Sequence, residues 1–383
     1  MLKKLFFSSI SACLFINSSS WAQSVNQSDI NGGATITTAV PFLNLNPDAR
    51  GAGLGDAGVA TSPDANSTYW NSAKLAFIEK GFGFSLAYNP WLRKLVPDMS
   101  LSYLSGYYKI RKEEVVALSM TYFDLGSIQF MDAAGKELQK FSPNEFAIAG
   151  TYSRKLSKTM GVGVTLRYIY SNLAGSIASS SGSEPTAGQT VAADIGYFYT
   201  KPISIKGTKN NLALGANISN VGAKISYGND SRKDFIPSNL RVGTSFTHEL
   251  DPYNKVILSL DLNKLLVPTP NPNDTTEKGL ISGIIGSFSD APGGFSEEMK
   301  EITISTGLEY WYNNVFAIRA GYFNESQMKG NRKYMTVGAG LKYQVFNLDM
   351  AYLVSFQQNN PLAETMRFTL SFNFDKKTDS VTE

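Results

Sequence analysis

The chain of 383 residues carries 35 Lys and Arg against 32 Asp and Glu, with one His and one Cys, so its formal net charge is only +3. This net charge is too small for electrostatic binding of nucleic acid, because the affinity of such binding depends on the number of phosphate groups that the protein neutralises. No run of 18 or more apolar residues occurs, which excludes a helical membrane span, whereas 12% aromatic residues and 33 Gly favour one large β architecture.

Residues 1–22 have the order of a secretory signal peptide. Two lysines precede an apolar run at 5–16, and the small residue Ala22 closes the polar stretch that follows, so we expect cleavage after Ala22. A lipoprotein signal ending at Cys13 is the alternative, but it leaves a very short apolar region. On the first interpretation the mature chain has no cysteine, and therefore no disulfide, thiol nucleophile or cysteine-based metal site.

Residues 23–80 precede the first predicted strand, and most of them show no alternation. Gly51, Gly53 and Gly55 lie in a run of small residues that suggests a phosphate-binding loop. That interpretation is poor, because no strand precedes the glycines and no Gly-Lys-Ser/Thr follows them. Small residues let a backbone fold tightly in a confined space. We therefore expect residues 23–80 to form a periplasmic plug inside a barrel.

Residues 81–374 alternate between apolar and polar side chains. Val162, Val164 and Leu166 share one parity, for example, whereas Thr165 and Arg167 share the other. Such period-2 segments, about ten residues long, match tilted strands that cross a membrane. Fourteen strands are predicted, near 81–90, 98–109, 113–125, 144–155, 159–171, 189–200, 210–220, 239–249, 254–263, 301–312, 315–324, 333–344, 347–356 and 364–374. An even number is what bacterial barrels require.

The lengths of the connections separate a barrel from a soluble β-sandwich, which alternates too. Tight joins alternate with long stretches for most of the chain, as periplasmic turns and extracellular loops do in an up-and-down barrel. The long stretches are 126–143, 172–188, 221–238 and 264–300, and the medium turn 201–209 fits the rule less well. The sequence thus predicts an all-β fold, a transmembrane antiparallel β-barrel of about fourteen strands with an N-terminal plug. A polar tail, 375–383, follows the last strand.

Charged residues sit within the strands at the polar parity, which faces the lumen of a barrel. They are Arg167, Asp194, Arg241, Asp261, Glu309, Arg319, Lys342 and Arg367, with Asp349 as a further acidic partner. One interpretation is a path for an anionic ligand such as a fatty acid. The other, which we favour, is that the basic and acidic side chains pair with each other and with the plug.

The stretch 264–300 is the longest of the predicted extracellular loops. It is rich in proline at first and then apolar, and the apolar residues are Leu280, Ile281, Ile284, Ile285 and Phe288. These side chains can dock on a partner protein or dip into the membrane interface. Alternatively, the loop simply packs over the mouth of its own barrel.

No catalytic or metal-binding constellation is evident. The single histidine, His248, is predicted near the periplasmic end of the eighth strand, the wrong rim for chemistry on the outer leaflet, and a solvated interfacial His is its commoner role. Without a mature cysteine, a metal site would rest on carboxylates, and no calcium-loop pattern occurs. The sequence predicts no enzyme activity, no metal and no cofactor.

The segment from Arg50 to Ala73 resembles the N-terminal hatch of FadL-type outer-membrane barrels, which have fourteen strands. The residues that carry this resemblance are Arg50, Gly51, Gly53, Gly55, Asp56, Asp64, Trp70 and Asn71. The run 48–66 is similar, more closely, to the PorV family of the type IX secretion system of Bacteroidetes. Ser72 departs from the family, where proline is usual.

The second resemblance implies a non-enzymatic role in protein secretion at the outer membrane. Members associate with a giant translocation barrel, receive cargo bearing a C-terminal signal domain and carry it to a cell-surface attachment complex. The extracellular loops would then face the cargo, and nucleic acid would not be a partner. The FadL resemblance implies the alternative, a channel for fatty acids or other hydrophobic small molecules. An outer-membrane lipid hydrolase is a more distant alternative.

Overall fold

The computed structural model describes residues 35–91, 98–131, 137–173, 186–205, 207–228, 233–270, 278–356 and 365–375. The predicted signal peptide, residues 1–22, lies outside the described residues, as do 23–34 of the expected plug and 376–383 of the expected tail. No helix in the described ranges is both long and apolar enough to cross a membrane.

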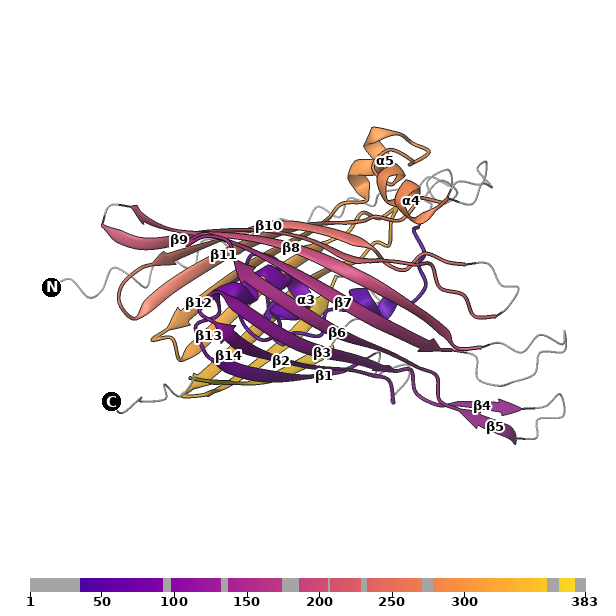
Figure 1. The fold of residues 1–383 in the computed structure, drawn as a ribbon, viewed down its shortest axis with the longest axis horizontal. Coiled ribbons are helices and arrows are strands. Elements are labelled where there is room, and N and C mark those ends of the chain that lie inside the picture. The colour runs from indigo at the N-terminus through magenta and orange to yellow at the C-terminus, as the bar shows by residue number, and fades with distance from the viewer. Residues whose placement is uncertain are drawn as a thin grey trace. The chain divides into compact units, whose positions relative to one another are not determined.

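Fourteen antiparallel strands close into one barrel, in which each strand pairs with its neighbours along the chain (Figure 1). The strands are β1 (Phe82–Pro90), β2 (Ser100–Arg111), β3 (Glu114–Asp124), β6 (Asn144–Lys155), β7 (Met160–Asn172), β8 (Gly188–Ile205), β9 (Thr208–Gly222), β10 (Asn239–Glu249), β11 (Asn254–Leu265), β12 (Thr303–Tyr312), β13 (Phe316–Asn324), β14 (Lys333–Tyr343), β15 (Phe346–Ser355) and β16 (Met366–Phe374). The predicted fourteen-stranded barrel is confirmed.

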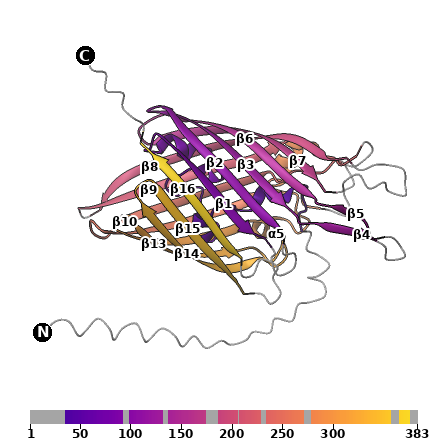
Figure 2. The same cartoon turned by 90° about the horizontal axis from the view of Figure 1, so that it is seen from below.

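The first and last strands close the barrel, and they lie side by side in Figure 2. Phe82 pairs with Phe374 and Tyr88 with Phe368, so the closing register runs along the whole of β1. The rings of Phe82 and Phe374 stack at 4.8 Å between centroids on the outside of this seam. Closure leaves no strand edge with unpaired backbone groups, as a membrane requires.

The apolar parity of the strands faces outward. Leu118, Leu166 and Ile195 are 64–70% exposed, whereas Ser85 and Ala87, which alternate with such residues, are fully buried. In water such an exposed apolar surface would be unfavourable, but in lipid it is the surface that a barrel must present. The chain is therefore an integral protein of the outer membrane, with its polar parity turned into the lumen.

The connection between β8 and β9 differs from the prediction of a medium turn over 201–209. Both strands continue past the expected boundary, and Ile205 pairs with Thr208. Gly207, with φ of +82°, takes a left-handed conformation that suits a tight hairpin. The prediction was wrong because Pro202 and the polar residues after it look like a turn, although the backbone pairing extends through them.

The extracellular end of the barrel, opposite the tight turns, carries strands and helices where the sequence predicted only loops. A hairpin of β4 (Ile128–Met131) and β5 (Glu137–Phe141) rises between β3 and β6. Two short helices, α4 (Leu280–Gly286) and α5 (Phe295–Lys300), stand between β11 and β12 and project from the barrel in Figure 1. Residues 271–277 of this loop lie outside the described residues.

The segment before β1 lies within the barrel, and we call its described part, residues 35–78, the plug (Figure 1). It consists of four short helical elements, η1 (Pro41–Asn44), α2 (Ala49–Gly53), α3 (Ser67–Trp70) and η2 (Ser72–Phe77). The α2 helix packs on β13 to β16, and η2 packs on β6, β7 and β8. The plug therefore contacts the lumen wall on both sides.

Candidate functional site

Asp48 organises the first half of the plug. Its carboxylate caps α2 by accepting hydrogen bonds from the backbone amides of Arg50 and Gly51, each at 3.0 Å. It also accepts hydrogen bonds from the side chains of Asn66 and Trp70, each at 3.1 Å. One buried carboxylate thus joins α2 to α3, because each hydrogen-bond donor that is shielded from water needs an acceptor within the protein.

Gly51 of the predicted hatch motif and Gly58, which was not singled out, allow the Trp70 ring to fit. A Cβ atom added at Gly51 or at Gly58 would overlap that ring. Gly55 has φ of +67°, where a side chain is strained, and its amide donates to Thr336 Oγ1 at 3.0 Å. The small residues therefore serve close packing within the plug and against the wall.

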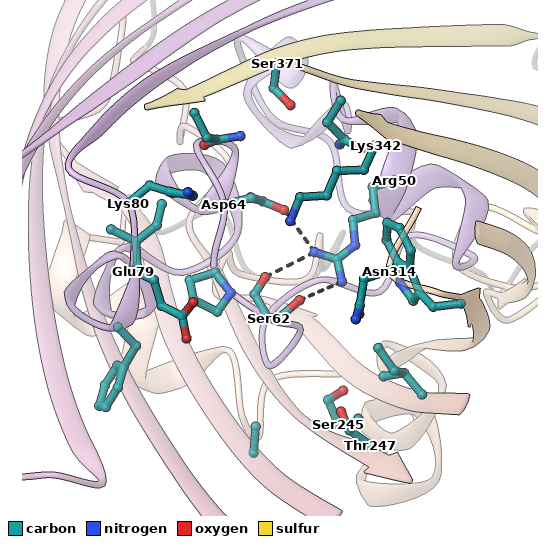
Figure 3. Close-up of a pocket in the computed structure, with 18 of the residues that line it drawn as sticks. Arg50, Ser62, Asp64, Glu79, Lys80, Ser245, Thr247, Asn314, Lys342 and Ser371 are labelled. Carbon is teal, nitrogen blue, oxygen red and sulfur yellow. Dashed lines mark hydrogen bonds and ion pairs between the residues drawn. The ribbon is translucent and has the colours of Figure 1, made fainter. Parts of the chain in front are cut away.

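Arg50 connects the plug to the barrel wall. Its guanidinium donates to the Glu309 carboxylate at 2.9 and 3.1 Å. It also donates to Asp64 at 3.1 Å and to Ser62 Oγ at 2.8 Å (Figure 3). Glu309 also accepts from Arg319 at 2.7 Å. One carboxylate is therefore shared between an arginine of the plug and an arginine of the wall.

The network continues along the wall from Arg319, which also lies 2.7 Å from an oxygen of Asp349. Glu309 and the Arg319 side chain are fully buried. Buried charges of this kind are tolerated only when they are paired and hydrogen-bonded. Arg50, Glu309, Arg319 and Asp349 form one ion-pair chain, which we call the plug lock.

The second half of the plug is held by a different set of contacts. The Asp261 carboxylate of β11 accepts hydrogen bonds from the amides of Gly58 and Val59 at 2.7 and 2.8 Å. Lys74 donates to the carbonyl of Gly58 at 2.7 Å and is fully buried. Asn71 donates to the carbonyls of Val59 and of Tyr197 on β8. This turn of the plug is therefore tied to two separate strands.

Asp56 ties the plug to β14 and β16. Its carboxylate accepts a hydrogen bond from the Tyr334 hydroxyl at 2.6 Å and lies 3.5 Å from Arg367. Arg367 in turn donates to the carbonyl of Asn46 at 3.0 Å. Together with the plug lock, these contacts attach the plug to the wall on the side formed by β12 to β16.

The other predicted lumen charges are placed in three different ways. Arg167 forms an ion pair with Asp194 at 2.8 Å, between β7 and β8. Arg241 of β10 is 6% exposed and its guanidinium lies over Tyr69 of the plug. Lys342, near the periplasmic end of β14, is exposed and lines a cavity. Of the predicted lumen charges, Glu309 and Arg319 therefore belong to the plug lock together with Asp349, whereas the others have separate partners or line a cavity.

Two cavities lie in the lumen. One is at the periplasmic end, which carries the tight turns and is called the turn end, and the other is at the extracellular end, which carries the long loops and is called the loop end. The larger, about 740 Å³, is lined at the turn end by Arg50, Asp64, Lys255 and Lys342, together with aromatic residues (Figure 3). The smaller, about 310 Å³, is lined at the loop end by Arg241 and other polar residues. The plug contributes residues to the walls of both.

The helical loop at the extracellular end is anchored by buried charges. Glu298 and Glu301 accept hydrogen bonds from Lys264 at 2.9 and 2.5 Å, and Lys329 donates to Glu297 at 2.6 Å. These five residues, which we call the loop anchor, fix α5 to the end of β11 and to the connection between β13 and β14. All five are less than 10% exposed.

Pairing shifts the ionisation of the loop anchor. Burial alone would raise the pKa of Glu297 and Glu301, but hydrogen bonds from Lys329, and for Glu301 also from Lys264, lower both pKa values below their ordinary range. Burial alone would lower the pKa of Lys329, but its two glutamate partners raise it. Each shift favours the charged form, so Glu297, Glu301 and Lys329 are ionised at neutral pH.

The apolar residues predicted for partner binding point in different directions. Ile281, Ile285 and Phe288 are 72%, 67% and 51% exposed, whereas Leu280 and Ile284 are partly buried. Phe295 and Met299 of α5, which the sequence did not single out, are 80% and 52% exposed. We call Ile281, Ile285, Phe288, Phe295 and Met299 the apolar crown.

His248 lies near the turn end of β10, as predicted, and its Nδ1 is 2.5 Å from Asn210 Oδ1. Within the described residues, no group of three or more His, Cys, Asp or Glu side chains is placed to hold a metal ion.

Sequence reasoning missed several residues that organise the site. Asp48 and Lys74 were not singled out, although Asp before a run of small residues is a recognisable helix N-cap signal. The loop anchor was missed as well, because no local pattern reveals that Lys264, Lys329 and three glutamates of α5 and its end converge.

Comparison with known proteins places these features in context. The sequence model of the family described as "Type IX secretion system protein PorV" matches residues 27–272, more than half of the chain. None of the curated proteins matches the chain.

Several solved structures are similar to the chain. The Pseudomonas putida toluene transporter TodX has 9% identity and a TM-score of 0.49, covering 84% of this chain and 95% of its own. A Pseudomonas aeruginosa FadL homologue has 14% identity and a TM-score of 0.42, with coverages of 90% and 99%. The Ralstonia pickettii toluene transporter TbuX has 11% identity and a TM-score of 0.43, with coverages of 86% and 98%. Identities this low carry no information on function.

Proposed function

The chain belongs to the PorV family of type IX secretion system proteins, and from this membership we propose that it receives secreted cargo and carries it along the cell surface. The cargo would bear a C-terminal signal domain, arrive from the giant translocation barrel and leave at a surface attachment complex. The protein would act by binding alone, within the outer membrane. Family membership is the observation that carries this proposal.

The apolar crown is the part of the molecule that fits cargo or translocon binding best. Its side chains stand beyond the ends of β11 and β12, on α4, on Phe288 just after it and on α5, which the loop anchor holds in place. Solvent-exposed apolar clusters of this kind mark protein or membrane interfaces. A rigid presentation favours binding, because little conformational entropy is lost when a partner docks.

A triple variant tests the crown. In the cell, Ile281→Ser, Ile285→Ser and Phe288→Ser together should reduce cargo secretion by about tenfold or more, since apolar anchors carry most interface energy. Serine substitutions keep α4 in place, whereas deleting 280–288 would also remove Gly283, against which Phe235 packs. The barrel should still assemble, which heat-dependent mobility in gels reports.

The matched control makes the same change on the other extracellular hairpin. Ile128 and Met131 are 46% and 59% exposed there, so Ile128→Ser with Met131→Ser should leave secretion at the wild-type level. Wild-type secretion by the crown variant would remove the crown from the proposal. Equal losses in both variants would mean that any polar change at this end is harmful.

The alternative function is a channel for fatty acids or other hydrophobic small molecules. Such a channel needs an apolar route, and the ion pairs that join Arg50, Glu309 and Arg319 make the described lumen polar instead. A pull-down of the tagged protein in mild detergent separates the two functions. Recovery of a giant barrel or of proteins with a shared C-terminal domain supports secretion, and recovery of the barrel with bound lipid alone supports the channel.

A further inference from the structure

Arg241 is the exception among the buried arginines of the lumen. Arg50, Arg167, Arg319 and Arg367 each lie within 3.5 Å of a carboxylate oxygen. Among the described residues, Arg241 has one hydrogen-bond partner, the neutral hydroxyl of Tyr69 at 3.1 Å. Its side chain is nevertheless buried, with 6% of the residue exposed. A buried guanidinium with unused donors is unfavourable unless something else accepts from them.

Arg241 faces amide side chains on the neighbouring strands, whereas the other four arginines have carboxylate partners. Arg319 stands directly opposite Glu309 in the β12–β13 register. Arg241 stands opposite Asn217 on β9 and Asn263 on β11. Aspartate has the same shape as asparagine and would have neutralised the arginine at either position. The two directly facing positions therefore give Arg241 no carboxylate partner.

An acidic residue on the same face of β11 holds the plug through one of its two oxygens, whereas its Oδ1 is buried without a hydrogen-bond partner. Asp261 lies two positions before Asn263, and its Oδ2 accepts the amides of Gly58 and Val59. No ion pair joins Arg241 to Asp261 within the described residues. Asp261 therefore holds the plug turn and does not occupy the donors of Arg241.

The plug completes a site around this guanidinium. Its Cζ lies 4.9 Å from the ring centre of Tyr69 and 5.1 Å from that of Trp70. The two rings pack on the guanidinium, and Arg241 lines the cavity of about 310 Å³ at the loop end of the lumen. Asn44 also lines this cavity, and its Oδ1 is buried without a hydrogen-bond partner.

The other charges around the cavity are internally balanced. Arg332 pairs with Glu325 at 2.7 Å, and Lys329 belongs to the loop anchor. The remaining lining combines amides and hydroxyls, such as those of Asn46, Asn239 and Thr303, with the apolar side chains of Ile36, Leu265 and Phe323. Such a mixed lining suits a small molecule that carries several polar groups on a short carbon skeleton. The volume is at the small end of the range for ligand pockets.

From this arrangement we propose that Arg241 binds the oxyanion of a small polar molecule that enters the lumen from the cell exterior. A planar guanidinium matches the two oxygens of a carboxylate or phosphate, and the amides around the cavity would bind the polar remainder. This inference rests on the lumen geometry alone and is independent of the role in secretion.

Titration calorimetry on the full chain in detergent micelles tests the site. Glucuronate and glucose 6-phosphate serve as the carboxylate and phosphate probes, and neutral glucose at equal ionic strength serves as the reference. We expect saturable binding of at least one anion and none of glucose. Binding of only one of the two anions would assign the natural ligand to that class. Absence of saturable binding by both anions would overturn the proposal.

Substitutions locate the binding. Arg241→Gln should weaken it by about tenfold or more, because the charged hydrogen bonds are lost. Asn263→Asp should weaken it similarly, since the new carboxylate occupies the guanidinium from the facing strand, and this variant keeps Arg241 and its packing. Arg154→Gln, at the exposed Arg154 on β6 and away from the cavity, should bind like the wild type. Binding to Asn263→Asp as tight as to the wild type would refute the role of Arg241.

Discussion

Arg50 of the plug and Glu309 of the barrel wall lie 259 positions apart in the chain, yet two hydrogen bonds of 2.9 and 3.1 Å join them. The same carboxylate accepts a bond from Arg319 on the next strand. The wall thereby holds a charged group in place to bind one side chain of the plug. The position of the plug therefore depends on residues of the wall as well as on its own.

The plug lock predicts an order of stabilities. Glu309→Gln leaves the buried Arg50 and Arg319 without their shared carboxylate, and we expect it to destabilise the protein by about 3–5 kcal/mol. Arg50→Gln should be milder, about 1–3 kcal/mol, because Arg319 still compensates Glu309. Denaturant unfolding followed by tryptophan fluorescence measures both.

The double variant decides whether the two residues act through each other. Changes in contact couple, so the sum of the two single effects should exceed the effect of Arg50→Gln with Glu309→Gln. Lys80→Gln breaks a solvent-exposed pair with Asp375 and should change stability by less than about 1 kcal/mol. Strict additivity of the two lock variants would show that they contribute separately.

Close packing of the plug gives a second prediction. In Gly58→Ala, the added methyl group meets the Trp70 ring, and overpacking of this kind destabilises by about 1–3 kcal/mol. Trp70→Leu in the same chain should relieve part of that loss, because the smaller side chain leaves room for the methyl. Protease protection of the plug in the assembled barrel measures the effect.

The control is a glycine with open space around it. Nothing lies within 4 Å of a Cβ added at Gly286, the last residue of α4. Gly286→Ala should therefore keep wild-type protection. If Gly58→Ala also kept it, the plug would be looser around Trp70 than the packing requires.

Sequence patterns anticipated the wall far better than the lumen. Alternation such as Val162, Val164 and Leu166 against Thr165 and Arg167 is a local signal, and it located all fourteen strands. The failure at 201–209 was local too, since Pro202 resembles a turn residue but fits within the extended hairpin.

The contacts of the site depend on closure of the barrel. The sequence marks Arg50 and Glu309 as charged, but it cannot pair them, because their meeting depends on the register of fourteen strands and the path of the plug. The sequence likewise cannot pair the two glutamates of α5, or Glu301 just after it, with Lys264 and Lys329. Taken alone, these glutamates look like a solvated helical face. Non-local pairing of charges carries no short-range signature.

The loop anchor predicts how the extracellular helices respond to pH. The pKa values of Glu297 and Glu301 lie below the ordinary 4.5, so their contribution is complete above pH 4.5 and is lost as the pH falls further through the folded-state values. The pKa of Lys329 lies above the ordinary 10.5, so its contribution is complete below pH 10.5 and is lost as the pH rises past it. A nitroxide on Ser296→Cys, at an exposed position of α5, should stay equally immobile from about pH 5 to pH 10.

Below pH 4.5 the nitroxide should become mobile, since protonated glutamates no longer hold the two lysines. The matched variant carries Glu297→Gln and Glu301→Gln as well as the label. Its spectrum should already be more mobile at pH 7 and should change less down to pH 3.5, because the two glutamates with lowered pKa values are gone. A mobility change near pH 6 in the wild-type background would assign the anchoring to other groups, since neither glutamate titrates there.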